Sequence, residues 1–290
     1  MNIYNRIKGG LYGVAVGDAL GGTTEFMTRR EIADQYGYLT DMIGGGVWHL
    51  EPGEVTDDTM MTLCVAEGIL ENPSEPLTAI GKRFLEWYYS NPKDIGNIIR
   101  FALRQYNGNW FDSAIEAHTT LGQSAGNGSL MRCLPAALCY TKLEDVTRIA
   151  RLQSKMTHYD DRCNEACEIY CRIVYRIINE GVNIHKAVQQ EIKHTKYSLM
   201  LDEELDCEPD GFVEHTFKWV IHILLTSHSF SEVVQKAANA GGDSDTIAAI
   251  AGGVAGVHYG YEDIPESYSS KILIADRLEQ VCDRIMTLRK

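Results

Sequence analysis

Two stretches decide the fold that we expect from this sequence: GGLYGVAVGDALGG at residues 9–22 and TIAAIAGGVAG at residues 246–256. Both are rich in glycine and alanine and are apolar nearly all round. Glycine in a helix costs about 1 kcal/mol relative to alanine, so its repeated use needs a reason. We expect helices that pack backbone to backbone in the centre of the protein. Tight packing is a sufficient explanation for these glycines, but it does not explain the acidic residues at their edges.

Helical periodicity dominates the rest of the chain. Few segments alternate in the way that a half-buried strand would, and no stretch has the composition of a linker. The sequence therefore predicts an all-α protein with a single domain over residues 1–290. Apolar residues recur at intervals of three and four most clearly in residues 57–70, 165–180, 212–226 and 271–289.

Composition and charge narrow the class of partner. The chain has 290 residues, of which 44% are hydrophobic and 23% charged, values typical of a globular protein. Its net charge of −13 repels phosphate backbones, which argues against nucleic acid as a partner. To bind a small anionic ligand, the protein would need a local feature that attracts negative charge, namely a cation, a loop of backbone amides or a helix N-terminus. The sequence offers all three.

We expect a cytoplasmic protein without a membrane span. No apolar run approaches the roughly 20 residues that a spanning helix needs, and residues 1–6 lack the basic and apolar blocks of a secretory signal. The eight cysteines are scattered. Cys163, Cys167 and Cys171 recur at four-residue spacing without close C-x-x-C pairs or histidine partners, so we expect reduced thiols packed on one helix face.

Two acidic helix starts share one design. Thr56-Asp57-Asp58-Thr59 precedes an apolar helical run, and an N-cap with acids in the first turn explains it adequately. Residues 241–246, GGDSDT, repeat the paired acids and the threonine after two glycines. Such carboxylate and hydroxyl oxygens suit magnesium, calcium or manganese rather than zinc. If the two starts meet, four carboxylates share one pocket, and two cations fit that charge better than one.

Other segments carry weaker signals. Gly126-Asn127-Gly128-Ser129 leads towards an apolar helical stretch and could point backbone amides at an anion, although a plain turn explains it equally well. Glu25 closes the first glycine-rich helix, Asp94 stands where an N-cap is expected before the run 95–106, and His158 fits a loop or a helix start. Spacing alone assigns no function to these three residues.

Read in order, these segments resemble the ADP-ribosylglycohydrolase family, and within it the nitrogenase-regulating branch, whose members remove ADP-ribose from an arginine. The resemblance covers nearly the whole chain, and several pieces in family order are specific where one would be weak. The matching segments are GVAVGDALGGTTEF at 13–26, VTDDTMM at 55–61, NPKDIGN at 91–97, AGNGSLMRCLPAAL at 125–138, MTH at 156–158 and NAGGDSDTIAAIAGGVAGVHYG at 239–260.

The resemblance implies an orthogonal all-α bundle with two magnesium ions, or manganese in some members, in a central cleft. Glu25 matches the acid that approaches the metals, and Asp94 matches the acid that faces the arginine end, where a carboxylate suits a guanidinium. The implied metal ligands are Thr56, Asp57, Asp58, Asp243, Asp245 and Thr246.

The resemblance also implies a set of ligand-binding residues. The GNGS loop matches the diphosphate cradle, His158 a ligand-contacting histidine, and Phe212 an aromatic wall near the ligand. The chain departs from the branch at Ser129 and Leu130, where alanines are common, and residues 195–210 match poorly and could alter which protein is accepted. The full expected set is Asn97, Gly126, Asn127, Gly128, Ser129, Met131, His158 and Phe212.

The function implied is metal-assisted hydrolysis of the N-glycosidic bond between ADP-ribose and a protein arginine. The partners would be an ADP-ribosylated protein and the product ADP-ribose, and the enzyme a monomer. The target stays open between a nitrogenase component, which would mean regulation of nitrogen fixation, another host protein and the victim of a toxin. One alternative keeps the fold but cleaves O-linked ADP-ribose, from serine or O-acetyl-ADP-ribose. Another is a non-catalytic ADP-ribose-binding protein, against which the presence of all six ligand types and Glu25 argues.

Overall fold

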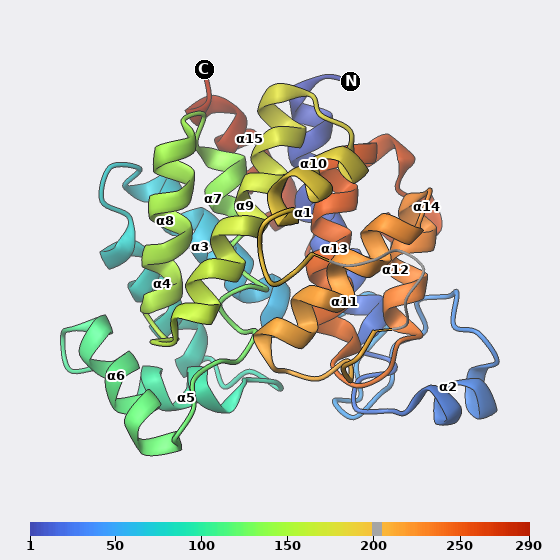
Figure 1. Cartoon of the computed structure of the whole chain (residues 1–290), viewed down its shortest axis with the longest axis horizontal. Coiled ribbons are helices and arrows are strands. Elements are labelled where there is room, and N and C mark those ends of the chain that lie inside the picture. The colour runs from blue at the N-terminus through green and yellow to red at the C-terminus, as the bar shows by residue number, and fades with distance from the viewer. Residues whose placement is uncertain (199–204) are drawn as a thin grey trace.

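The computed structural model describes residues 1–198 and 205–290 and is built from helices (Figure 1). Within these residues the β pairing consists of two isolated bridges, Gly45–Leu50 and Gly126–Phe212. The prediction of an all-α protein is therefore confirmed. The α-helices are α1 (Ile3–Gly21), α2 (Arg29–Tyr36), α3 (Asp57–Glu71), α4 (Leu77–Tyr89), α5 (Asn97–Arg104), α6 (Trp110–Leu121), α7 (Leu134–Cys139), α8 (Leu143–Lys155), α9 (Asp161–Glu180), α10 (Ile184–Ile192), α11 (Val213–Thr226), α12 (Phe230–Ala238), α13 (Ser244–Tyr259), α14 (Glu266–Ser269) and α15 (Ala275–Leu288), with a 3₁₀ turn at Tyr261–Asp263.

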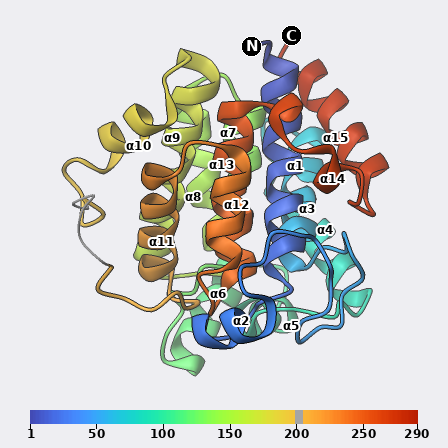
Figure 2. The same ribbon diagram turned by 90° about the vertical axis from the view of Figure 1, so that its right-hand side faces the viewer.

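Helices α1 and α13 run antiparallel and side by side through the centre of the molecule (Figures 1 and 2). Small residues stand at every fourth position along the shared face of α1. A Cβ atom on Gly13 would overlap the carbonyl of Gly252, and one on Gly17 would overlap the carbonyl of Ala248. The two backbones therefore touch, which explains why both helices are rich in glycine despite its cost to helix stability.

The other helices surround this central pair. Helices α3, α12 and α15 pack against α1, while α9, α11 and α12 pack against α13. Both chain termini lie at one end of the molecule, and α2, α5 and α6 lie at the opposite end (Figures 1 and 2). Because α1 begins at the end that holds the termini, its C-terminal end and the start of α13 meet near α2 and α5.

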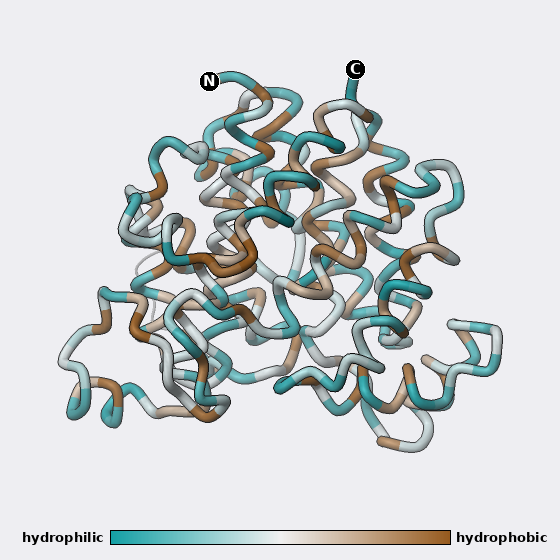
Figure 3. The backbone as a smooth tube through the Cα atoms, turned by 180° about the vertical axis from the view of Figure 1, so that it is seen from behind, coloured by the Kyte–Doolittle hydropathy of each residue, from teal (hydrophilic) through white to brown (hydrophobic). Residues whose placement is uncertain are grey.

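Apolar side chains of the helices form one continuous core, against which α2 packs only the partly buried Tyr36. Along the backbone, hydrophobic positions recur within the helices, while many connecting loops are hydrophilic (Figure 3). The eight cysteines are free thiols, and those at 163, 167 and 171 are buried on one face of α9, as the spacing predicts. In the described part of the chain, no helix is long and apolar enough to cross a membrane.

Several predicted helix limits shift in the structure. The run 271–289 becomes a helix only from Ala275, and the run 95–106 forms α5 over Asn97–Arg104. Helix α1 ends at Gly21, so Glu25 lies in the turn that follows it rather than at its end. Helix ends depend on local backbone geometry that periodicity does not report.

The contact between α1 and α13 yields a stability prediction. The variant Gly13→Ala should lower the free energy of unfolding by about 3 kcal/mol, because its methyl group must push two helix backbones apart. Gly122→Ala is the matched control: Gly122 has φ +72° with open space around a Cβ, so it should cost only about 1–2 kcal/mol for its left-handed backbone. Urea unfolding of both variants measures the difference, and equal losses would contradict a close-packed backbone contact.

Candidate metal centre and ligand cleft

Three helix ends meet in one cleft. The close contact continues to the end of α1, where a Cβ on Gly21 would overlap the backbone of Asp245 at the start of α13. The first turn of α3 joins them, because Thr246 Oγ1 donates a hydrogen bond of 3.2 Å to Asp58 Oδ2. The two acidic helix starts, far apart in sequence, therefore lie against each other, with Glu25 beside them in the turn after α1.

Asp18 anchors the start of α3, and the sequence analysis missed it. Its fully buried carboxylate, on α1, accepts hydrogen bonds from the backbone N–H and the hydroxyl of both Thr56 and Thr59. Burial raises its pKa to about 6, and these hydrogen bonds limit the rise. A single acid in the otherwise apolar stretch 9–22 is the sequence signal that could have identified it.

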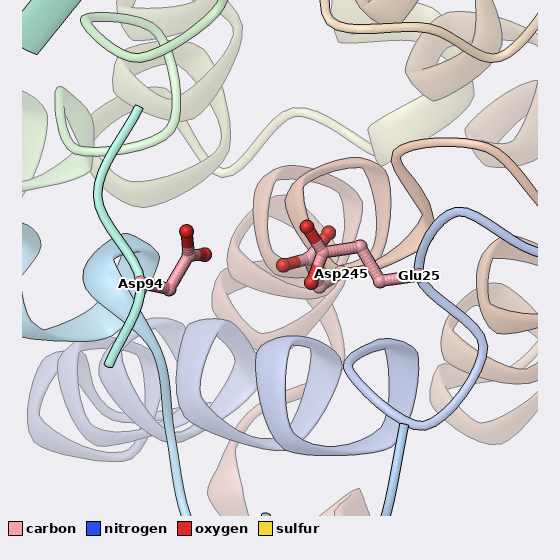
Figure 4. A group of neighbouring side chains, drawn as sticks. All are labelled: Glu25, Asp94 and Asp245. Carbon is pink, nitrogen blue, oxygen red and sulfur yellow. The ribbon is translucent and has the colours of Figure 1, made fainter. Parts of the chain in front are cut away.

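Three carboxyl groups converge at the centre of the cleft. Glu25, Asp94 and Asp245 each offer an oxygen, and these oxygens lie within 4.8 Å of one another. Figure 4 shows the three side chains pointing together from different elements: the turn after α1, the loop before α5 and the start of α13. The structure thus brings Glu25 and Asp94, predicted as catalytic acids, to within metal-binding distance of a predicted ligand.

The electrostatics of this cluster favour cations. Burial and neighbouring acids raise the pKa of Asp57, Asp58 and Asp245 well above the ordinary value. None of the ion pairs in residues 1–198 and 205–290 involves these carboxyls. Asp58 Oδ1 and Asp245 Oδ1 are buried without a hydrogen-bond partner. Buried, unpaired carboxylate oxygens are hard donors that fit Mg²⁺ or Mn²⁺, so the residues present suit such ions.

Glu25 is held by a residue that the sequence did not single out. Trp48 Nε1 donates a hydrogen bond of 2.6 Å to Glu25 Oε2. Burial and the nearby carboxylates of Asp94 and Asp243 raise the pKa of Glu25 to about 8. An acid with a pKa near neutrality can both accept and release a proton under physiological conditions. The following residue, Phe26, has φ +63° and is exposed at the edge of the cleft.

The GNG segment forms a wall of the cleft beside the start of α13. Asn127 Nδ2 donates to Asp243 Oδ2 at 2.5 Å and to Thr216 Oγ1 at 3.0 Å. The backbone N–H of Asn127 donates to the carbonyl of Gly211 at 3.0 Å, which fixes the segment to the turn before α11. Asn127 thus orients one of the predicted metal ligands.

The predicted site residues divide into those that line the cleft and those behind it. The cleft has a volume of about 600 Å³. Thr56 and Asp58 lie behind its lining, where Asp58 contacts Thr246. The lining includes the predicted residues Glu25, Asp57, Asp94, Asn97, Gly126, Asn127, Gly128, Met131, His158, Asp243, Asp245 and Thr246.

Ser129 and Phe212 do not line the cleft. The Ser129 hydroxyl is fully buried, accepts from Ser154 Oγ at 2.9 Å and lies 3.7 Å from Cys167 Sγ. Phe212 pairs with Gly126 through a backbone bridge, and its ring packs against the guanidinium of Arg162, 5.1 Å away. Both residues support the wall of the cleft from behind.

Three local expectations need correction. Asp94 is not an N-cap: α5 begins after Gly96, and the Asp94 carboxylate instead raises the pKa of Asp57. Thr56 occupies the N-cap position of α3 but makes no side-chain cap, because its hydroxyl donates to Asp18. The GNGS segment does not lead directly into a helix, since α7 begins only at Leu134. In the poorly matching stretch 195–210, residues 199–204 lie outside the described residues.

Comparisons with known proteins identify the family of this chain. The family profile described as ADP-ribosylglycohydrolase matches residues 1–290. The chain is 34% identical to the ADP-ribosyl-[dinitrogen reductase] glycohydrolase of Rhodospirillum rubrum, over 93% of this chain and 91% of that protein. It is 30% identical to the ADP-ribosylarginine hydrolase Tri1 of Serratia proteamaculans, over 97% and 79%.

More distant relatives extend the similarity. The ADP-ribosylhydrolase ARH3 of Gallus gallus is 24% identical over 98% of this chain and 91% of its own. A solved structure described as an ADP-ribosylglycohydrolase-related protein complex superposes with a TM-score of 0.84 at 27% identity, over 99% of both chains. The family profile and the relatives of 34% and 30% identity define the class of protein, a hydrolase of ADP-ribosyl linkages. The chain belongs to the ADP-ribosylglycohydrolase family, and the resemblance seen in its sequence is confirmed.

The raised pKa values predict how pH affects stability in the absence of metal. Glu25 has a folded pKa of about 8 against an ordinary 4.5, and Asp18 about 6 against 3.8. Groups whose pKa is raised by folding stabilise the fold when protonated, so this stability is lost as the pH rises towards 8. In EDTA, the melting temperature should fall as the pH rises from the ordinary pKa values of these acids to about 8. Excess Mg²⁺ should raise it more at the upper end, where protons no longer compete.

Asp245→Asn provides the control for this behaviour. It removes one buried carboxyl, so the metal-free variant should lose less stability with rising pH and should respond weakly to Mg²⁺. Thermal melts with and without EDTA measure both effects. A wild-type melting temperature that rises with pH in EDTA would contradict the assignment.

Proposed function

We propose that this protein is a Mg²⁺-dependent hydrolase that cleaves the N-glycosidic bond between ADP-ribose and a protein arginine. The observation that carries the proposal is the convergence of Glu25, Asp94 and Asp245 in the cleft beside the GNG segment. Support for arginine as the acceptor comes from the names of the relatives at 34% and 30% identity, which include an ADP-ribosylarginine hydrolase.

The proposed cation site is formed by the two acidic helix starts. Two cations fit the charge of this site better than one, and Mn²⁺ can replace Mg²⁺ with the same oxygen donors. When bound, the cations supply Lewis-acid activation of the attacking water and of the ribose hydroxyls. The residues that would hold them are Thr56, Asp57, Asp58, Asp243, Asp245 and Thr246, with Glu25 and Asp94 at the edge of the site.

The chain's own residues then move the protons. Glu25, oriented by Trp48, accepts a proton from the attacking water, whose oxygen forms a bond to the anomeric carbon of the ribose. The bond from that carbon to the arginine nitrogen breaks, and its electron pair stays on the nitrogen. The nitrogen takes up a proton from the solvent, to which Glu25 releases the proton that it accepted. Asp94, across the cleft from Glu25, pairs with the guanidinium and positions it as the leaving group (Figure 4).

We base the proposed substrate and product on the family, and the proposed cytoplasmic location on the free thiols. The substrate is an ADP-ribosylated protein, the product is ADP-ribose, and the enzyme acts as a monomer. Free thiols at all eight cysteines are compatible with the reducing cytoplasm. Regulation of nitrogen fixation is one role that the Rhodospirillum relative suggests by its name.

A turnover assay tests the proposed function. With excess Mg²⁺, the protein should release ADP-ribose from an arginine-modified protein, measured by chromatography of the free product, and EDTA should stop the release. Asp245→Asn should lower the rate by about 10³-fold, because the variant loses one carboxylate oxygen and its negative charge from the proposed cation site. Asp41→Asn, which removes an exposed acid remote from the lining, is the charge-matched control and should leave the rate unchanged. Binding of ADP-ribose without turnover would instead indicate a non-catalytic binding protein.

A variant of Asp94 tests which bond between ADP-ribose and its acceptor the enzyme cleaves. Asp94→Asn should lower the rate on arginine-linked substrate by about 10²-fold, because a guanidinium leaving group loses its carboxylate partner. Saturating Mg²⁺ should not restore the rate, which separates this role from metal binding. Parallel assays on serine-linked ADP-ribose and O-acetyl-ADP-ribose measure the preference. Faster release from either O-linked substrate by the wild type would overturn the arginine assignment and favour the activity of the O-linked branch.

A further inference from the structure

Arg132 is buried in an unusual way. Its side chain is fully inaccessible, yet none of the ion pairs in the described residues includes it. The guanidinium lies 4.5 Å from the centre of the Phe84 ring, and Nε donates to Gln153 Oε1 at 2.9 Å. Nη2 donates to Gln153 O at 3.0 Å and to Thr157 Oγ1 at 2.7 Å. Burying a cation without a carboxylate is unfavourable, so the arrangement calls for a role beyond packing.

The contact with Thr157 fixes the direction of the next hydrogen bond. Arginine carries donors only, so the Thr157 oxygen accepts from Arg132 and keeps its own proton. Thr157 Oγ1 lies 2.8 Å from Nδ1 of His158. In the part of the chain that the structure describes, no other acceptor lies within hydrogen-bonding distance of this hydroxyl. Buried hydroxyl groups donate where an acceptor is available, so Thr157 donates to Nδ1.

An accepting Nδ1 determines the state of the imidazole ring. Burial and the positive charge of Arg132 lower the pKa of His158 to about 3, so the ring is neutral at physiological pH. A neutral imidazole carries one proton, and with Nδ1 as the acceptor that proton is on Nε2. The Nε2 nitrogen has no hydrogen-bond partner among the described residues.

The free edge of the ring faces the GNG segment of the cleft. A Cβ atom on Gly126 would lie 3.4 Å from Nε2, and one on Gly128 would lie 3.2 Å from Cε1. His158 itself lines the cleft beside both glycines. The absence of side chains at these two positions therefore leaves Nε2 access to a ligand that rests on the segment.

We propose that Arg132 and Thr157 are positioning residues that hold His158 as the Nε2–H tautomer, so that its ring donates a hydrogen bond to a diphosphate oxygen of bound ADP-ribose. The identity of this ligand rests on the proposed function. The tautomer does not, because the chain from Arg132 through Thr157 to His158 is present in the free protein.

Nuclear magnetic resonance of the ligand-free protein tests the tautomer directly. With ¹⁵N-labelled histidine, the His158 ring should show an unprotonated Nδ1 and a protonated Nε2, and the variant His158→Ala identifies its signals. Thr157→Val should change the ratio of the two tautomers, whereas Thr157→Ser should preserve it. A ring protonated on Nδ1, or on both nitrogens at neutral pH, would overturn the proposal.

Calorimetry with ADP-ribose and excess Mg²⁺ tests the consequence for binding. Thr157→Val should weaken the affinity by about 10-fold, and Thr157→Ser should stay near the wild-type value. In a His158→Ala background, Thr157→Val should cause no further loss, since Thr157 acts through His158. Additive losses, or an unchanged affinity in Thr157→Val, would contradict the proposal. Wild-type protein that binds no ADP-ribose would refute the proposed function, while the resonance measurement would still decide the tautomer.

Discussion

The contact between the backbones of α1 and α13 is the constraint on which the rest of the structure depends. Gly13 and Gly17 lie directly on carbonyl groups of α13, so the two helices can pack closely in only one register. That register brings the C-terminal end of α1 to the start of α13. Glu25 therefore reaches Asp245 across a short turn. Asp18, one turn before the end of α1, then fixes the start of α3 through Thr56 and Thr59. One close-packed face thus determines where the ends of α1, α3 and α13 meet at the cleft.

This rigidity allows the protein to crowd carboxylates that would otherwise repel one another. A flexible scaffold would relieve the repulsion by moving the acids apart or by admitting water. Here α1, α3 and α13 are buried along most of their length, and Trp48 and Asn127 hold Glu25 and Asp243 by short hydrogen bonds. The carboxyl groups therefore stay close together in the fold, where their oxygens favour divalent cations.

Sequence patterns predicted the long elements and the two acidic helix starts, because both depend on local spacing. They could not show the role of Asp18, since an acid inside an apolar helix acquires meaning only when Thr56 and Thr59 fold over it. The expected cap at Asp94 failed for a related reason: its carboxylate faces acids from other elements rather than its own helix. The family resemblance named most of the residues that line the cleft, while the direction of each side chain, as at Ser129, required the packing around it.

The acidic cleft belongs to a molecule with a net charge of −13, and this affects the kinetics of encounter. Within the screening length of about 8 Å, the negative surface repels an anionic diphosphate rather than guiding it. Free nucleotide-like anions should therefore associate faster as ionic strength rises, opposite to the behaviour of a steered enzyme, and an anionic product departs along a favourable field. A partner with basic residues on its facing surface is attracted before any contact forms. The surface field thus discriminates between macromolecular partners earlier than the cleft does.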